Sequence, residues 1–474
     1  MTFFVLLQLL FVQKNVTKVH FVVQKSVVKP RFIVQKNVIK MEREVYNQLI
    51  MWKKDPNRRP LILNGARQVG KTWLLHEFAH REYKKVAAFS LDRHVEARDI
   101  FEHGGDIQKI LRSLSALASV DITPGDTLLI LDEIQDCPQA LSSLKYFYED
   151  APNIHVAVAG SLLGISLHEQ TSFPVGKVDI IRVYPMNFAE FLRALGRDQM
   201  AEELMKGDWN IIDALHNSYV DLLRQYYYVG GMPGVVAAYS SRGLLQEVRE
   251  LQKKILVDYE EDFSKHAPTN EVPRIRMVWN SIPSQLAKEN KKFVYSALRK
   301  GARASAFEVA IQWLVDAGLI YKVPRVNAVK MPLKFYEDFN AFKLFILDVG
   351  LMGAMVDAPA ATMMVGNTVF NEYKGAFTEL YVCMQMQGTK LPLFYYNTEN
   401  SRIELDFVTQ IVSSVFPVEV KAELNVHAKS MSTFLSKNPN LSGICLSMKP
   451  HFNKGRMEFI PLFAFKEDFM RKAT

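Results

Sequence analysis

The chain has 474 residues, of which 49% are apolar and 23% are charged, a composition typical of a globular protein with two or three domains. Its three cysteines, Cys137, Cys383 and Cys445, lie far apart, without the spacing of a metal site. This pattern excludes a disulfide-rich secreted scaffold and indicates reduced thiols in a cytoplasmic protein.

Residues 1–40 differ from the rest of the chain. They hold seven basic residues and no acidic one, so the net charge of +8 leaves only +1 for the remainder and does not indicate a nucleic-acid partner. A Gln-Lys-Asn/Ser-Val motif recurs there with a spacing of 11 residues. Either these residues form a small β-rich or right-handed helical array, or they are translated repetitive DNA ahead of a start at Met41. No stretch predicts a transmembrane helix, so we expect no membrane partner.

A glycine-rich loop between a strand and a helix gives the strongest signal in the sequence. The apolar run Leu61–Leu63 predicts a short buried strand, and helical spacing resumes at Leu74. The segment between them fits G-x-x-x-x-G-K-[ST], a pattern in which backbone N–H groups close around phosphates at a helix N-terminus. Lys71 would reach the β- and γ-phosphates of ATP, and Thr72 would offer its hydroxyl to Mg²⁺. The loop consists of Gly65, Ala66, Arg67, Gln68, Val69, Gly70, Lys71 and Thr72.

A second apolar strand ends in the acidic pair Asp132 and Glu133. Asp132 would hold the magnesium ion, and Glu133 would polarise the attacking water. The next apolar strand leads to Ser161, which either senses the γ-phosphate or is a structural turn residue. Arg182, after the following strand, could act as an arginine finger or be a surface or structural residue. The sequence therefore predicts a Mg²⁺-dependent ATPase.

The middle of the chain shows helical spacing over residues 187–290 and contains the run YYYVGGMPGVV, Tyr226–Val236. Its glycines and proline predict a sharp turn, and its three tyrosines are expected to pack in the core. Residues 291–326 are typical of a winged helix. The basic residues of this segment either face DNA or form a solvated surface on an arm packed against the ATPase; they are Lys291, Lys292, Arg299, Lys300 and Arg303.

Near the C-terminus, residues 402–422 alternate between apolar and polar side chains. Period-two alternation predicts two antiparallel strands, which we expect to turn between Val412 and Ser413. In that register Asp406 faces Glu419 on the neighbouring strand.

This hairpin would place three carboxylates and one ammonium on one face, since Glu404 would face Lys421. Crowded carboxylates repel each other unless a cation shares the site. Either Asp406 and Glu419 hold Mg²⁺, with Lys421 steadying a hydroxide or phosphate oxygen, or the face is a salt-bridged surface without chemistry. Glu379, on a helix predicted upstream, could be a further metal ligand.

From about Met41 to the C-terminus, the chain resembles prokaryotic AAA-superfamily ATP-binding proteins with a C-terminal restriction-endonuclease-like, PD-(D/E)xK domain of unknown function. The stretches that carry the resemblance are PLILNGARQVGKT, LLILDEIQ, SFPVGKVDIIRVYPMNFAEFL, YYYVGGMPGVV, FKLFILDVGLM, KGAFTELYV, IELDFV and FPVEVKA. The resemblance implies nucleotide and magnesium roles for Lys71, Thr72, Asp132 and Glu133. It also implies nuclease-like roles for Glu379, Asp406, Glu419 and Lys421.

We therefore expect an α/β protein with a P-loop, AAA-type parallel sheet, a helical middle with a winged helix, and a C-terminal α/β restriction-endonuclease-like domain. The expected function is ATP hydrolysis, with ATP and Mg²⁺ as cofactors, whose nucleotide state controls a nuclease-like domain acting on DNA. The alternatives are a nucleotide-switched regulator or defence sensor that binds DNA or protein without cleaving, and a remodeller of a partner protein. The chain could also form a homo-oligomer. The expected divisions are the repeat 1–40, the ATPase 41–200, the helical and winged-helix region 201–335, and the nuclease-like domain 336–474.

Overall fold

The computed structural model describes residues 41–103, 105–160, 173–174, 176–288, 291–365, 374–398, 403–422 and 428–474. The chain divides into two compact units, Met1–Val38 and Ile39–Thr474. The array predicted for residues 1–40 lies outside the described residues, and so does Ser161. Within the described ranges, no helix is long and apolar enough to cross a membrane.

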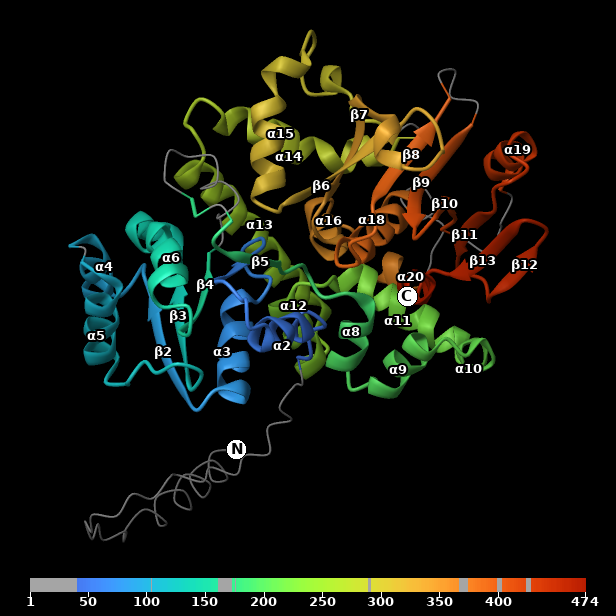
Figure 1. The fold of residues 1–474 in the computed structure, drawn as a ribbon. Helices are drawn as coiled ribbons and strands as arrows, with labels where there is room; N and C mark the ends of the chain where they lie inside the picture. The colour runs from blue at the N-terminus through green and yellow to red at the C-terminus, as the bar shows by residue number, and fades with distance from the viewer. Residues whose placement is uncertain are drawn as a thin grey trace, which may run out of the picture. The chain divides into compact units, whose positions relative to one another are not determined.

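A parallel sheet of five strands lies in the first part of the second unit, coloured blue to green in Figure 1. The strand order is β2-β3-β4-β1-β5, and every neighbouring pair is parallel. Parallel strands covered on both faces have nearly continuous apolar sequences, which is why four of the five could be recognised from the sequence; sequence reasoning missed β2, whose residues alternate between buried and more exposed. The strands are β1 (Leu61–Asn64), β2 (Lys85–Ser90), β3 (Thr127–Asp132), β4 (His155–Ala159) and β5 (Asp179–Arg182).

Helices cover both faces of this sheet (Figure 1). Successive side chains of one strand enter opposite hydrophobic clusters, because strand side chains alternate between faces. Leu61 and Leu63 pack with α2 and α3, whereas Ile62 packs with α4, α5 and α6. The helices are α2 (Tyr46–Lys54), α3 (Lys71–Glu82), α4 (Val95–Glu102), α5 (Ile107–Ala118) and α6 (Pro138–Asp150), with the 3-10 helix η1 (Ile134–Asp136).

A helical region follows, as the spacing predicts. The tyrosines at 226–228 are buried, so their predicted place in the core is confirmed. The predicted turn is also present but shorter than expected, because Pro233 already starts a helix, where its missing N–H costs nothing. The helices are α8 (Phe188–Ala194), α9 (Asp198–Lys206), α10 (Trp209–Ala214), α11 (His216–Val229), α12 (Pro233–Arg242), α13 (Leu245–His266) and α14 (Val272–Leu286).

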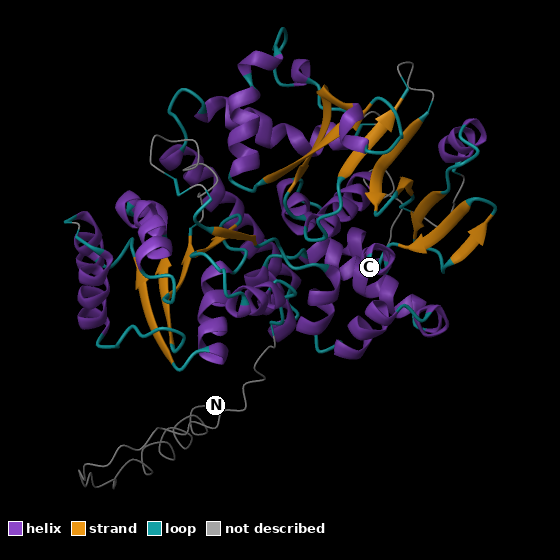
Figure 2. Cartoon of the chain, in the orientation of Figure 1, coloured by secondary structure: helices purple, strands orange, loops and turns teal. Residues whose placement is uncertain are grey.

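A mixed sheet of eight strands forms the C-terminal part; Figure 2 shows its strands apart from those of the parallel sheet. Its order is β12-β13-β11-β10-β9-β8-β6-β7. The strand predicted for the winged helix, β6, pairs with β7 and β8, so that segment is built into the C-terminal sheet. The strands are β6 (Ile320–Val326), β7 (Glu337–Ile346), β8 (Leu393–Asn397), β9 (Glu404–Ile411), β10 (Ser414–Val420), β11 (Gly443–Ser447), β12 (Phe452–Lys454) and β13 (Met457–Pro461).

The predicted hairpin is present as β9 and β10. Ser414 pairs with Ile411 and Val418 pairs with Phe407, which is the predicted register. The helices of this part are α15 (Glu308–Asp316), α16 (Val349–Met355), α17 (Ala360–Val365), α18 (Lys374–Gln387), α19 (Lys429–Lys437) and α20 (Phe465–Ala473). The 3-10 helices are η2 (Tyr295–Ala297), η3 (Ala304–Ala306) and η4 (Leu333–Tyr336).

Candidate nucleotide site and C-terminal carboxylate cluster

The glycine-rich loop follows β1 directly, and its backbone requires glycine at two positions. Gly70, the N-cap of α3, has a φ of 91°, which side-chain-bearing residues rarely adopt. A Cβ on Gly65 would lie 2.2 Å from the carbonyl oxygen of Val183, just beyond β5. The loop therefore closes tightly at the N-terminus of α3, where free backbone N–H groups favour an anion.

Lys71, the first residue of α3, is buried and folds back onto the loop. Its Nζ donates to the carbonyl oxygens of Gly65 and Ala66, each at 2.9 Å. Burial lowers the pKa of Lys71 to about 8, an effect opposed by the nearby carboxylates of Glu133 and Asp132. A desolvated ammonium thus lies beside the loop, where a bound anion would stabilise its charge.

The acidic pair at the end of β3 lies at the same site. The Thr72 side chain makes a hydrogen bond with Asp132, while burial raises the pKa of that carboxyl. Glu133 has a φ of 50°, and Gln135 Nε2 donates to its carboxylate at 2.7 Å. The structure therefore brings Thr72, Asp132 and Glu133 together, whereas Arg182 lies exposed at the end of β5.

Lys71, Thr72, Asp132 and Glu133 line a cavity of about 510 Å³, a volume within the range of ligand sites. Sequence reasoning missed six of the residues that line it, which are Met41, Arg43, Trp73, Pro233, Gly234 and Ala237. Arg43 fixes the loop from outside, donating to the carbonyl oxygen of Val69 at 3.0 Å. Trp73 directly follows the motif, whereas the others reach the cavity from separate parts of the chain and are marked by no local pattern.

Comparison with known families agrees with this geometry. Residues 57–192 match the family described as AAA domain. This segment is an AAA domain. Residues 220–362 and 374–464 match two families described as domains of unknown function, DUF8612 and DUF4143. No curated protein sequence matches the chain.

Several solved structures share a remote likeness with the chain. The Walker-type ATPase of Pyrococcus abyssi is 15% identical with a TM-score of 0.43, and the match covers 67% of this chain and 96% of that one. The Aeropyrum pernix ORC1 protein in complex with DNA is 13% identical with a TM-score of 0.24, over 67% and 91% of the two chains. The Thermotoga maritima RuvB Holliday junction branch migration motor is 16% identical with a TM-score of 0.29, over 60% and 90%. TM-scores this low do not indicate a shared function.

Helix α13 contacts the glycine-rich loop of the AAA domain. Arg67 Nη1 donates to Asp262 Oδ1 at 2.7 Å, and Gln68 Nε2 donates to Asp258 Oδ2 at 2.6 Å. The hydroxyl of Tyr259 donates to the carbonyl oxygen of Arg67 at 2.8 Å. The two loop side chains therefore hold α13, and the loop conformation is coupled to that helix.

A turn beside the AAA cavity also contacts the C-terminal part. The buried carboxylate of Asp348 accepts from the N–H groups of Gly231 at 2.6 Å and Leu351 at 2.9 Å. A Cβ on Gly230 would lie 2.2 Å from Asp348 Oδ1. Asp348 thereby caps α16 and holds the turn that leads to Pro233.

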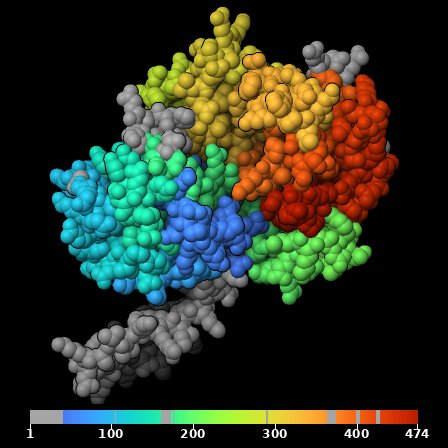
Figure 3. Space-filling view, viewed as in Figure 1, coloured from blue at the N-terminus to red at the C-terminus, as the bar shows by residue number. Residues whose placement is uncertain are grey.

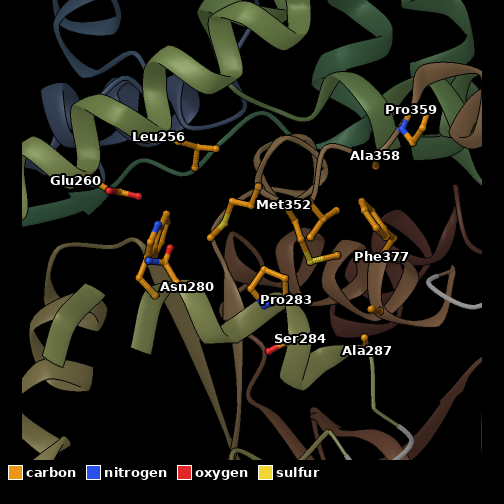
Figure 4. Close-up of a pocket in the computed structure, with 14 residues that line it drawn as sticks. Leu256, Glu260, Asn280, Pro283, Ser284, Ala287, Met352, Ala358, Pro359 and Phe377 are labelled. Carbon is orange, nitrogen blue, oxygen red and sulfur yellow. The ribbon is translucent and has the colours of Figure 1, made fainter. Parts of the chain in front are cut away.

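A larger cavity of about 660 Å³ lies where α13, α14, α16 and α18 meet (Figure 4). Leu256 and Glu260 reach it from α13, and Met352 reaches it from α16. It contains none of the residues predicted for either site. Helix α13 thus borders this cavity as well as the glycine-rich loop.

In the C-terminal sheet, predicted acidic residues surround a lysine that the sequence did not single out. Lys343 on β7 is fully buried, with its Nζ 3.2 Å from Glu404 Oε1 and 3.4 Å from Glu379 Oε2. Glu379 also forms an ion pair with Lys291. The interpretation of Lys291 as part of a DNA-facing surface is therefore wrong, since its ammonium neutralises a buried carboxylate.

The two strands of the hairpin carry the rest of this carboxylate cluster, which we define as Glu379, Glu404, Asp406 and Glu419. Asp406 accepts from the Val420 N–H at 2.8 Å, and burial, followed by the nearby Glu379, raises the pKa of Asp406 to about 7. Glu419 pairs with Lys421 at 2.6 Å, and Glu404 pairs with Lys343. These pairs replace the Glu404–Lys421 pair considered from the sequence.

The two predicted metal sites differ in how well their residues fit a cation. Thr72 and Asp132 offer a hydroxyl and a carboxylate beside the glycine-rich loop, a donor set that suits Mg²⁺. In the carboxylate cluster, lysines already neutralise Glu379 and Glu419. Throughout the described part of the chain, no group of three or more His, Cys, Asp or Glu side chains is arranged to hold a metal ion. The cluster as built therefore does not fit a divalent metal.

Proposed function

We propose that this chain is an ATP-hydrolysing AAA protein whose nucleotide state is transmitted to a C-terminal module that binds DNA. One observation supports the first half: Lys71, Thr72, Asp132 and Glu133 line a single cavity of the AAA domain. A polyanion in this cavity would meet free N–H groups, an ammonium and a carboxylate suited to Mg²⁺.

Each residue has a defined task in this proposal. The Lys71 ammonium would exchange the carbonyl oxygens of Gly65 and Ala66 for phosphate oxygens. Thr72 and Asp132 would hold Mg²⁺, which when bound offsets the negative charge of the triphosphate. Glu133, whose carboxylate is oriented by Gln135, would polarise the water that attacks the γ-phosphate.

Two sets of contacts would carry the nucleotide state to the C-terminal part. Arg67 and Gln68 connect the loop to α13 by hydrogen bonds. A loop that rearranges around bound phosphates would therefore shift that helix. Gly231 ties the cavity wall to Asp348. Because packed interfaces are bistable rather than continuously deformable, such small shifts can be amplified into a change between two packings.

Binding without cleavage is favoured for the C-terminal module by its charge balance. Lys291, Lys343 and Lys421 neutralise carboxylates that a catalytic metal would need. The second candidate, metal-dependent DNA cleavage, is supported by the order of Glu379 on a helix, Asp406 on a strand and Glu419-x-Lys421. That is the order of the PD-(D/E)xK pattern.

The proposal can be tested by measuring ATP turnover and plasmid nicking with Mg²⁺ or Mn²⁺. The Glu133→Gln variant should bind ATP but lose turnover, whereas the exposed control Glu96→Gln should retain both. Wild type and Asp406→Ala should both leave the plasmid intact. If wild type nicks the plasmid and Asp406→Ala does not, binding without cleavage is contradicted and metal-dependent DNA cleavage is the better account. Full turnover by Glu133→Gln would overturn its assigned task.

A further inference from the structure

Two phenylalanines are exposed where the chain passes from β6 to β7: Phe335 lies in the connection, and Phe339 lies near the start of β7. Phe335 is 86% exposed and Phe339 is 80% exposed, and Met331 in the same connection is 48% exposed. In Figure 3 this part of the chain, coloured light orange, lies on the molecular surface. Large apolar side chains exposed together, with polar neighbours, mark interaction sites.

The first phenylalanine belongs to an anchored segment. Leu333 and Val329 are buried in the hydrophobic cluster beneath the connection. The N–H of Asn327 donates to the carbonyl oxygen of Tyr336 at 2.8 Å, which closes the segment at its base. Phe335 is therefore exposed because the fixed backbone around it points it outward.

The second phenylalanine lies in a β-bulge. Asp338 pairs with Arg325, but Phe342 pairs with Pro324, so residues 339–341 are inserted on β7. The bulge is held by Asp338, which accepts from the Asn340 N–H at 2.9 Å and pairs with Arg325 at 2.5 Å. Bulges commonly re-aim a side chain next to a functional site.

Basic residues outnumber acidic ones in the sequence around these side chains. Residues 291–343 hold ten Lys or Arg and four Asp or Glu, although Lys343 is buried and Lys291 and Arg325 are paired with carboxylates. Lys330 and Lys334 are exposed on either side of Met331, and Lys292 is close enough to Asp338 for their charges to interact. Lys322 lies over the ring of Phe342, 4.5 Å from its centroid.

We propose that this aromatic–basic surface, Lys330–Phe339 with Lys292 and Lys322, binds an unpaired stretch of DNA. Bases stack on Phe335 and Phe339, and phosphates contact the lysines. Unpaired strands expose base faces that a duplex hides, and such faces stack on aromatic side chains regardless of sequence. This inference rests on the proposed function, and it specifies the form of DNA and where it binds.

Contacts within the sheet link the β-bulge to the strand that carries Glu404. Arg325, which holds the bulge, also donates to Asn397 Oδ1 at 3.2 Å, and Asn397 pairs with Glu404 across β8 and β9. From β7 to β9 there are three strand spacings of about 4.8 Å, roughly 14 Å in total. A strand held by the phenylalanines would thus extend toward Glu404.

The test is fluorescence anisotropy of the full chain with a labelled oligothymidine and with a duplex of equal length. We expect tighter binding of the oligothymidine, and at least about a tenfold loss in Phe335→Ser/Phe339→Ser, because each stacked base contributes about 1–3 kcal/mol. Lys330→Gln/Lys334→Gln should weaken binding and lower its salt dependence. The control Met205→Ser/Leu244→Ser, which changes exposed apolar side chains elsewhere, should bind as wild type does.

Equal affinity of wild type and the phenylalanine variant, a preference for duplex, or no oligothymidine binding would overturn the inference. The inference would also be overturned if the phenylalanine variant lost self-association, or lost binding to anionic vesicles, while its DNA affinity stayed the same. ATP turnover is measured on the same proteins and should be unchanged in every surface variant. If the wild-type protein does not hydrolyse ATP, that result counts against the proposed function and leaves the inference about DNA binding unaffected.

Discussion

The backbone N–H of Gly231 donates to the buried carboxylate of Asp348 at 2.6 Å. Gly231 belongs to the turn that leads into α12, where Pro233 lines the AAA cavity. Asp348 caps α16, and α16 packs against α18, the helix that carries Glu379. This hydrogen bond thus joins the wall of the AAA cavity to the helices beside the carboxylate cluster.

The Gly230→Ala substitution should destabilise the protein strongly. Gly230 has a φ of 74° and a ψ of −168°, a conformation that is nearly exclusive to glycine, and a Cβ there would meet Asp348 Oδ1 at 2.2 Å. We expect the free energy of unfolding in urea to fall by about 2–3 kcal/mol. The matched control is Gly243→Ala, at φ 67° with open space around the Cβ, which should lose only about 1 kcal/mol. Equal losses in the two variants would contradict the close contact.

The Asp348 carboxyl should make stability depend on pH. Burial raises the pKa of Asp348 to about 6, although backbone hydrogen bonds from Gly231 and Leu351 oppose the shift. Between about pH 4 and 6 the folded protein keeps a proton that the unfolded chain releases, so stability falls as the pH rises through 6. Relative to Asp348→Asn, the wild-type free energy of unfolding should therefore drop by about 1 kcal/mol between pH 5 and pH 7. A constant difference, or a rise, would show that Asp348 is already ionised at pH 5.

Removing the contact of Arg67 with α13 should weaken ATP binding without abolishing it. Arg67 Nη1 donates to Asp262 on α13 from the phosphate loop, so Arg67→Ala frees the loop to adopt other conformations. A lost charged hydrogen bond of about 1 kcal/mol corresponds to roughly a fivefold change in Kd by titration calorimetry. Lys253→Ala, which removes an exposed ion pair between α13 and Asp357, is the control and should leave Kd unchanged. Identical Kd values for Arg67→Ala and wild type would remove α13 from the coupling route.

Lys343→Met should cost about 3 kcal/mol of stability, measured by urea unfolding. The substitution leaves the half-buried Glu404 without its ion-pair partner and removes one of the two lysines that pair with the buried Glu379, and uncompensated buried charge is strongly destabilising. Adding Glu404→Gln should recover part of the loss, because it removes the unpaired charge. A loss below about 1 kcal/mol, with no recovery in the double variant, would mean that water or another cation already compensates the cluster.

Local rules were enough to predict the glycine-rich loop between β1 and α3 and the C-terminal hairpin. The loop is dictated by the conformational freedom of Gly65 and Gly70, and the hairpin register by the turn at Val412 and Ser413. Both depend on residues close together in the sequence. The local sequence pattern was therefore sufficient to predict both the loop and the hairpin.

The interior of the C-terminal site could not be predicted in the same way. Lys343 lies in an apolar strand, and its burial is compensated by Glu379 and Glu404, which follow much later in the chain. Lys291 resembled its solvent-facing neighbours because its partner is equally distant. Strand β6 was assigned to a winged helix because its sequence does not specify which sheet it joins. Domain limits at 41–200, 201–335 and 336–474 stay predictions, and β6 favours a last boundary before Ile320.

The central claim is that the loop at residues 65–72 captures ATP through backbone N–H groups and the Lys71 ammonium. Titration calorimetry of ATP with Mg²⁺ tests it most directly, using wild type, Lys71→Ala and the control Lys84→Ala on an exposed lysine. The account predicts saturable binding by wild type, an unchanged Kd in Lys84→Ala, and at least about a tenfold weaker Kd in Lys71→Ala, since hydrogen bonds to a charged group contribute about 1.5–3 kcal/mol. Equal ATP affinity in wild type and Lys71→Ala would contradict it.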